Sequence, residues 1–173
     1  MEAAENEDVV IIKEQTACFT GHREIPALQL ISLRRKLKRT IVSCIKDGYR
    51  FFGAGGALGF DTLAAKTVLD LKKDYPDIKL ILVLPCLNQT RGWKDTDVET
   101  YEKIKAQADK VVYTSEQYFR GCMQKRNRHL VDNSSLCISY LTSDTGGTAY
   151  TVNYASTKGL KIINLAELYE AIP

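Results

Sequence analysis

Short apolar runs alternate along this chain with longer segments in which apolar residues recur at helical spacing. Such alternation is typical of βαβ units, in which helices cover a mostly parallel sheet. The pattern therefore predicts one α/β domain of three layers with a mostly parallel sheet of about six strands. The expected strands are Thr16–Thr20, Tyr49–Ala54, Ile78–Leu84, Lys110–Tyr113, Leu136–Leu141 and Lys161–Asn164.

The segments between these runs have the three- and four-residue spacing of amphipathic helices. The first carries Leu30, Leu33, Leu37, Ile41 and Ile45 on one face, and Asp47-Gly48 ends it as a helix C-terminal glycine does. Further helices are expected over about Asp61–Asp74, Val98–Ala108, Tyr118–Val131 and Thr148–Thr157, with a short one after Asn164. A short edge strand over Val9–Ile12 is a further option.

Length, charge and cysteine content narrow the class of protein. A chain of 173 residues favours a single domain, with residues 1–14 as a flexible N-terminal extension and residues 15–173 as the folded unit. The net charge of +3 gives no case by itself for nucleic-acid or membrane binding. Five dispersed cysteines without CxxC spacing favour reduced thiols over disulfides or zinc. Without a signal-peptide or membrane-span pattern, a cytoplasmic location is expected.

Two glycine-rich turns carry the clearest functional signal. Gly53-Ala54-Gly55-Gly56-Ala57-Leu58-Gly59-Phe60-Asp61 and Thr145-Gly146-Gly147-Thr148 each join a predicted strand to a predicted helix. Glycines at such a turn allow positive φ and close approach of a phosphate, and the helix start favours an anion. Because parallel strands end at one edge of a sheet, the two turns are expected to converge on one ligand. The alternative is two independent turns, with Asp61 as a helix cap.

Other polar residues are placed by the pattern at the same edge. His22 and Arg23 follow the first strand, where Arg23 would bind phosphate and His22 would donate to it or act as an acid or base. Arg126 and Asn127 lie on the fourth predicted helix, either in contact with a ligand or facing solvent. Trp93 would stack on a base or cover the core.

The runs CFTGHR, GAGGALGFDTLAA, LPCLNQTRGWKDTDVETYEKIKAQADKVVYTSEQY, RNRHLVDNSSLCISY and TGGTAYTVNYA resemble the YpsA-like proteins of the SLOG superfamily. The resemblance covers about residues 16–164, in order. It implies a Rossmann-like fold related to DNA-processing protein A (DprA) and to the lonely-guy phosphoribohydrolases, with a nucleotide or nucleotide derivative as ligand. The ligand-binding residues that it implies are Gly21, His22, Arg23, Gly53, Gly55, Gly56, Gly59, Asp61, Gln89, Trp93, Arg126, Asn127, Gly146, Gly147 and Thr148.

Three functions follow from these residues. The first is the binding or sensing of a phosphate-bearing nucleotide-like ligand such as ADP-ribose, NAD or a nucleoside phosphate. The second is hydrolysis or transfer at an N-glycosidic bond, with Asp61 or His22 as catalytic residue. However, the phosphoribohydrolase pattern PGGxGTxxE, whose Glu acts at that bond, has no counterpart in TGGTAYTVNYA. The third is single-stranded DNA binding, which is possible but not favoured; a continuous basic groove would distinguish it, and the charge of the sequence favours neither the second function nor the third. No metal or resident cofactor is indicated, and a homo-oligomer is an open alternative.

Overall fold

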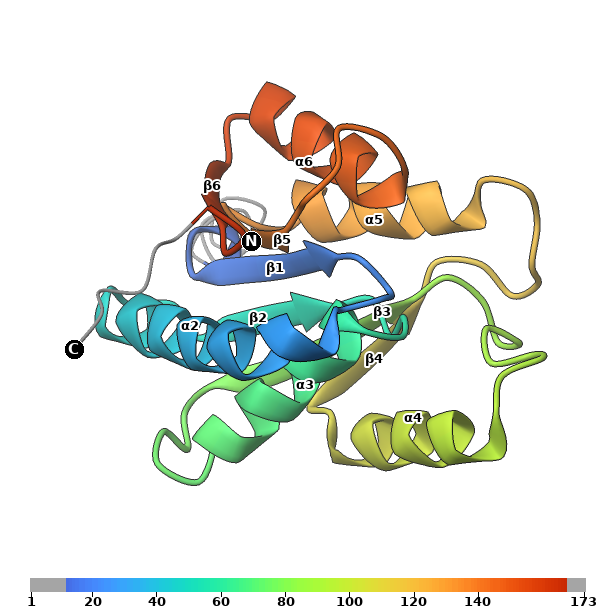
Figure 1. The fold of residues 1–173 in the computed structure, drawn as a ribbon, viewed down its shortest axis with the longest axis horizontal. Coiled ribbons are helices and arrows are strands. Elements are labelled where there is room, and N and C mark those ends of the chain that lie inside the picture. Colours follow the sequence, from blue (N-terminus) through green and yellow to red (C-terminus); the bar gives the residue numbers. More distant parts are fainter. Residues whose placement is uncertain (1–11, 168–173) are drawn as a thin grey trace, which may run out of the picture.

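A computed structural model describes residues 12–167 and shows a three-layer α/β domain (Figure 1). Six parallel strands form one sheet in the order β4-β3-β2-β1-β5-β6. The strands are β1 (Thr16–Gly21), β2 (Phe51–Ala54), β3 (Lys79–Leu84), β4 (Lys110–Tyr113), β5 (Leu136–Tyr140) and β6 (Lys161–Asn164). The predicted fold class and all six strands are confirmed, with ends that differ by at most two residues.

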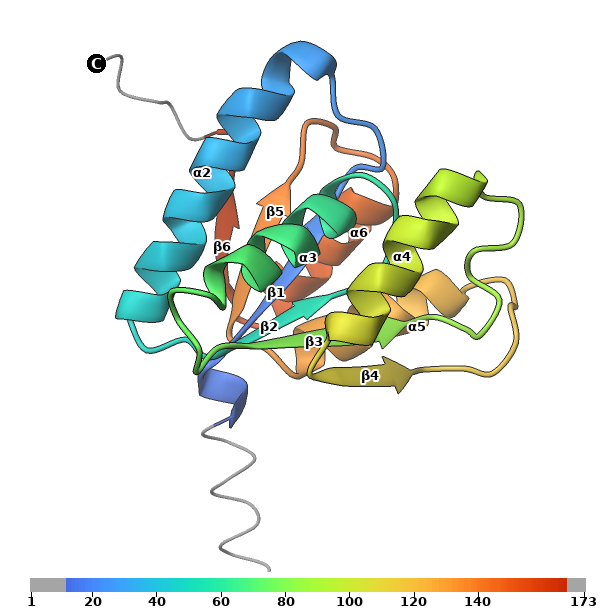
Figure 2. The ribbon, with the colours of Figure 1, turned by 90° about the horizontal axis from the view of Figure 1, so that it is seen from below.

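Helices cover both faces of this sheet. Their bounds are α2 (Ala27–Lys46), α3 (Phe60–Leu71), α4 (Asp95–Gln107), α5 (Cys122–Asp132) and α6 (Gly147–Thr157). As Figures 1 and 2 show, α2, α3 and α4 pack on one face, and α5 and α6 pack on the other. No helix among residues 12–167 is long and apolar enough to cross a membrane.

The main core lies between the sheet and helices α2 and α3. Leu33, Leu37 and Ile41 of α2 are buried there, as their spacing predicts. The side chains of Phe19 and Phe52 stack between neighbouring strands with ring centroids 6.2 Å apart. A smaller cluster on the opposite face joins α5 and α6 to the sheet. All five cysteines are buried and free.

Three segments differ most from the sequence prediction. Helix α5 begins at Cys122 and not near Tyr118, because Gly121 adopts a left-handed φ of 98° that an α-helix cannot contain. Ile12 belongs to a helical turn, so the predicted edge strand is wrong at that residue, and residues 9–11 lie outside the described part. Residues 165–167 form a turn where a short helix was expected, and the following residues are also outside it.

Asp109 fixes the start of β4 against two other elements. Its carboxylate accepts hydrogen bonds from the Leu80 N–H at 2.8 Å and from Lys72 Nζ at 2.7 Å. Burial opposes ionisation, but the hydrogen bonds from Lys72 and Leu80 prevail and hold the pKa of Asp109 below its usual value. We expect Asp109→Ala to lower the free energy of unfolding by about 1.5–3 kcal/mol at pH 7.

This contribution has a defined pH dependence. Because the pKa of Asp109 is lower in the folded chain, its stabilisation is complete above the unfolded pKa of about 3.9 and is lost as pH falls through the folded value. Urea unfolding of the parent and of Asp109→Ala from pH 7 to pH 2 measures it. A difference that does not shrink below about pH 4 would contradict the assigned role of the carboxylate.

Candidate functional site

The strand order reverses beside β1, and a cavity opens at that point. Strands β2, β3 and β4 follow in turn on one side of β1, whereas β5 and β6 lie on the other. The loops after β1 and β5 therefore diverge around a crevice at the carboxyl edge of the sheet. His22 Nε2 accepts a hydrogen bond from the Thr142 N–H at 3.0 Å and so joins these two loops. The adjoining cavity has a volume of about 270 Å³.

Many of the residues expected to bind a ligand line this cavity. They come from the end of β1 and the loop after it, from the starts of α3 and α6, and from α5. These residues are Gly21, His22, Arg23, Asp61, Arg126, Asn127, Gly147 and Thr148. The remaining expected residues are not part of its wall: Gly53, Gly55, Gly56, Gly59, Gln89, Trp93 and Gly146.

Asp61 is a buried carboxylate in the first turn of α3. Its side chain is part of a residue only 7% exposed, and its Oδ2 accepts a hydrogen bond from the Ala57 N–H at 3.3 Å. Burial raises the pKa of Asp61, and the charge of Arg126 and the N–H groups of Ala57 and Gly55 oppose this rise. The first glycine-rich turn thus already encloses a carboxyl group of the chain itself, and the N–H groups of Ala57 and Gly55 are directed to that group.

Arg126 is buried, at 4% exposure, and crosses from α5 to the end of β2. Its Nη1 donates to the carbonyl oxygen of Gly55, and its Nε donates to Asn127 Oδ1 at 2.7 Å. Burial lowers the pKa of Arg126, while the negative charge of Asp61 acts in the opposite direction. Arg126 is therefore not a solvent-facing helix charge. Its guanidinium holds the first glycine-rich turn, and the residue also borders the cavity.

Close packing explains why glycine is needed at some positions of the two turns but not at others. A Cβ at Gly55 would lie 2.5 Å from Arg126 Nη1, and one at Gly59 would lie 2.1 Å from the Arg23 carbonyl oxygen. Gly59 also has a φ of 77°. By contrast, a Cβ at Gly147 would meet nothing within 4 Å, although this residue borders the cavity. Packing accounts for Gly55 and Gly59 but leaves Gly147 unexplained.

Positive charge exceeds negative charge around the cavity. Arg23 is exposed and, among residues 12–167, has neither a hydrogen bond nor an ion pair. It lies close enough to Arg126 for the two charges to repel, which contributes to the lowered pKa of Arg126. Asp61 is the one carboxylate in the wall. Helix α6 also starts here with no side-chain cap on its N-terminus. An anion is the group that this surplus would attract.

Trp93 and Gln89 lie away from the cavity wall. The Trp93 ring packs edge-on against Tyr101, with centroids 5.6 Å apart, at the margin of the main core. Gln89 is buried, and its Nε2 donates to the Gly55 carbonyl oxygen at 3.2 Å. The core interpretation of Trp93 is the one that this packing favours. Gln89, together with Arg126, holds the end of β2 in place.

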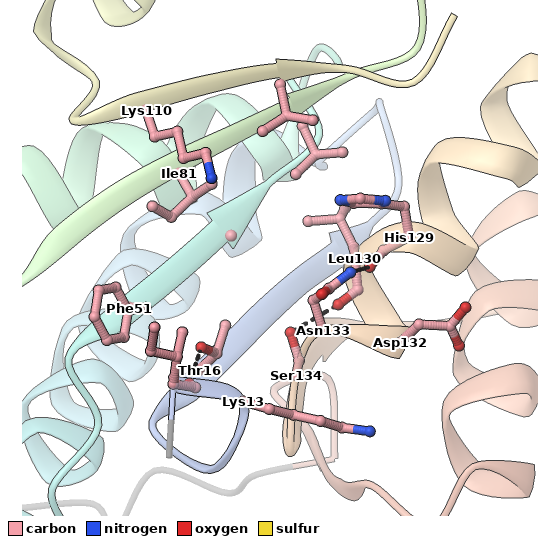
Figure 3. Close-up of a pocket in the computed structure, with 14 residues that line it drawn as sticks. Lys13, Thr16, Phe51, Ile81, Lys110, His129, Leu130, Asp132, Asn133 and Ser134 are labelled. Carbon is pink, nitrogen blue, oxygen red and sulfur yellow. Dashed lines mark hydrogen bonds between the residues drawn. The ribbon is translucent and has the colours of Figure 1, made fainter. Parts of the chain in front are cut away.

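A larger cavity of about 390 Å³ lies elsewhere, over the middle of the sheet beside α5 (Figure 3). Its wall is mostly apolar, with Ile81 and Leu130 among the contributors. Two polar groups at its rim already form hydrogen bonds within the chain: Ser134 Oγ donates to the Leu130 carbonyl oxygen, and Asn133 Nδ2 donates to the His129 carbonyl oxygen. None of the expected ligand-binding residues except Gly53 borders it.

A second hollow beside the crevice was not anticipated from the sequence. It adjoins the first cavity, shares His22 and Arg23 with it, and extends towards Glu24 and Gln29. The position of Glu24 directly after His22-Arg23 is the one sequence signal that would have indicated it. Gln29 reaches the hollow from the first turn of α2, which no motif marks.

The fold and this crevice define the chain as a Rossmann-like α/β protein with its candidate site at the switch point of the sheet. It belongs to the YpsA family (YspA SLOG family), whose sequence model matches residues 21–165. A UPF0398 protein of Brevibacillus brevis is 31% identical over 136 residues, which cover 77% of this chain and 71% of that protein.

Solved structures of DNA processing protein A share the fold. The protein from Helicobacter pylori matches with a TM-score of 0.63 and 18% identity over 90% of this chain, and that from Streptococcus pneumoniae with 0.62 and 18% over 88%. This chain spans 66% of the first and 50% of the second. At this level of identity, the likeness concerns the fold alone.

Proposed function

We propose that this protein binds or senses a phosphate-bearing nucleotide or nucleotide derivative at the crevice between β1 and β5. The observation that carries the proposal is the charge of the cavity wall, where Arg23 and Arg126 lie beside a single carboxylate, Asp61. Asp61 is already engaged by the turn before α3. The unpartnered guanidinium of Arg23 is therefore available to a phosphate, which it can bind through two parallel N–H groups.

The start of α6 supplies the second half of the phosphate site in this proposal. Its first N–H groups and its dipole favour an anion, and Thr148 lies in the same wall. The absence of a side chain at Gly147 leaves room for close approach of a phosphate to the backbone. We therefore assign the phosphate to the turn before α6 and not to the turn before α3, whose N–H groups bind Asp61.

Binding is favoured over cleavage by the state of the two candidate catalytic residues. Asp61 is engaged with the Ala57 N–H. His22 Nε2 accepts from Thr142. In this proposal these two bonds assign Asp61 Oδ2 to the turn before α3 and His22 Nε2 to the loop after β5, rather than to proton transfer.

Single-stranded DNA is the second candidate ligand. The Helicobacter pylori DprA structure is described as showing a single-stranded DNA binding mode. In this chain, Tyr118 and Phe119 are exposed next to Arg120 and before α5, a combination of aromatic and basic residues that suits stacked bases. A nucleotide remains the first choice, because Arg23, Arg126 and the start of α6 converge on one cavity at the switch point.

Thermal unfolding in the presence of ligands tests the proposal. We expect ADP-ribose, NAD or a nucleoside phosphate to raise Tm where the parent nucleoside does not, because binding to the folded state adds about 2.7 kcal/mol at a hundredfold excess over Kd. Gly147→Val is expected to abolish the shift, because its side chain occupies the space at the start of α6. The Tm of this variant without ligand should stay close to that of the parent.

Asn153→Val is the matched control, since it places the same side chain at an exposed position of α6 outside the cavity. It should retain the full ligand shift. Equal shifts for nucleosides and their phosphates would contradict the proposal, as would an undiminished shift in Gly147→Val. Stabilisation by a single-stranded oligonucleotide but by no mononucleotide would favour the second candidate.

A further inference from the structure

The hollow beside the phosphate cavity has the character of a binding groove for the rest of the ligand. Its volume is about 700 Å³, and it lies between the loop after β1, the start of α2 and the end of β5. Because His22 and Arg23 border both spaces, a ligand whose phosphate occupies the first would extend directly into the second. No such continuation leads towards Trp93, which packs against Tyr101.

The walls of this groove are held in place by bonds within the chain. The Tyr140 hydroxyl donates to Gln29 Oε1 and so orients the amide, which leaves the two Nε2 hydrogens for other acceptors. His22 packs edge-on to Tyr140, with centroids 6.0 Å apart, and is joined to Thr142. The groove is thus formed before any ligand arrives.

Glu24 is the acidic group of this groove. It is exposed, and within residues 12–167 its carboxylate has no hydrogen bond and no ion pair. An ionised carboxylate only accepts hydrogen bonds, so its partner on a ligand has to be a donor. It would also repel a second phosphate. The neutral donors that a nucleotide carries next to its phosphate are the hydroxyl groups of its sugar.

Resting on the proposed function, we propose that the sugar of the ligand lies in this groove and that Glu24 accepts hydrogen bonds from its vicinal hydroxyls. The protein would then select ribose over 2-deoxyribose ligands. Glu24 sets this specificity, whereas Arg23 and the start of α6 hold the phosphate. A carboxylate suits the recognition of a diol, because its two oxygens can accept hydrogen bonds from two neighbouring hydroxyls at once.

Calorimetric titration with inorganic phosphate, ribose 5-phosphate and 2-deoxyribose 5-phosphate tests this inference without assuming a base. We expect the deoxy sugar phosphate to bind the parent about tenfold more weakly than the ribose compound, as for one lost hydrogen bond to a charged group. In Glu24→Ala this ratio should fall to about twofold, while the affinity for inorganic phosphate should change by less than about twofold. Asp144→Ala, an exposed carboxylate in the loop after β5 outside the groove, is the control and should keep the preference.

The outcomes separate the two proposals. If no phosphate compound binds the parent, the proposed function fails. If inorganic phosphate binds but the two sugar phosphates bind equally well, only the groove inference is overturned. A ribose preference that survives in Glu24→Ala would also overturn it, because another group would then recognise the hydroxyls. Release of free base from a nucleoside monophosphate that disappears in Glu24→Ala would make Glu24 a catalytic residue instead.

Discussion

Arg126→Ala is expected to lower the free energy of unfolding by about 3–5 kcal/mol, the cost of removing one partner from a buried charged network. The guanidinium is buried and donates to the Gly55 carbonyl and to Asn127 Oδ1. Without it, Asp61 would remain buried without the positive charge that most opposes the rise of its pKa. Urea unfolding followed by circular dichroism measures the loss. Phosphate binding should also weaken, since the cavity loses a charge.

Arg128→Ala is the matched control. This residue lies two positions further along α5, does not border the cavity, and donates from Nη1 to the Tyr150 hydroxyl at 3.0 Å. Its removal should leave the urea midpoint and the ligand affinity unchanged, as expected for a screened charge at the surface. Equal small losses in both variants would contradict the structural role of Arg126. A larger loss in Arg128→Ala would show that Arg128, and not Arg126, is the residue through which α5 supports the site.

The sheet and the edge that carries the candidate site could be predicted because they depend on local patterns. Apolar runs of four to six residues identify strands, and a parallel sheet brings all strand ends to one edge. This argument alone places His22 and Arg23 near Gly147 and Thr148, and the structure brings them together at one cavity. Element ends are less certain, as the start of α5 shows, because a left-handed glycine has no signature in hydrophobic spacing.

The interior of the site could not be predicted in the same way. Arg126 and Gly55 are 71 positions apart, and helical spacing does not tell a buried arginine from a solvated one. The same holds for Asp61, where a helix-starting carboxylate at the surface and one enclosed by its own turn give identical sequence patterns. Hydrogen bonds with these two residues hold the backbone of the first glycine-rich turn in place. The turn before α6 is thereby left as the one with free space for a ligand.

Gly59→Ala tests the structural role of the first glycine-rich turn, because a Cβ at this position would meet the backbone of Arg23. We expect a loss of about 2–6 kcal/mol in the free energy of unfolding, from the left-handed φ together with the clash of a new Cβ with the Arg23 carbonyl. Gly48→Ala separates the two causes, since Gly48 has a φ of 101° but nothing within 4 Å of a Cβ. It should cost only about 1–2 kcal/mol, the strain of the left-handed conformation alone.

The same pair of variants connects the first glycine-rich turn to the ligand. Relief of the clash in Gly59→Ala has to move the backbone of Arg23, so the variant should also lose most of the ligand-dependent rise in Tm. Gly48 lies at the far end of α2, and Gly48→Ala should keep the parent's rise in Tm despite its lower stability. Differential scanning calorimetry with and without ligand gives both quantities from one sample. Equal losses of stability in the two variants would show that the close approach of Gly59 to Arg23 is unimportant.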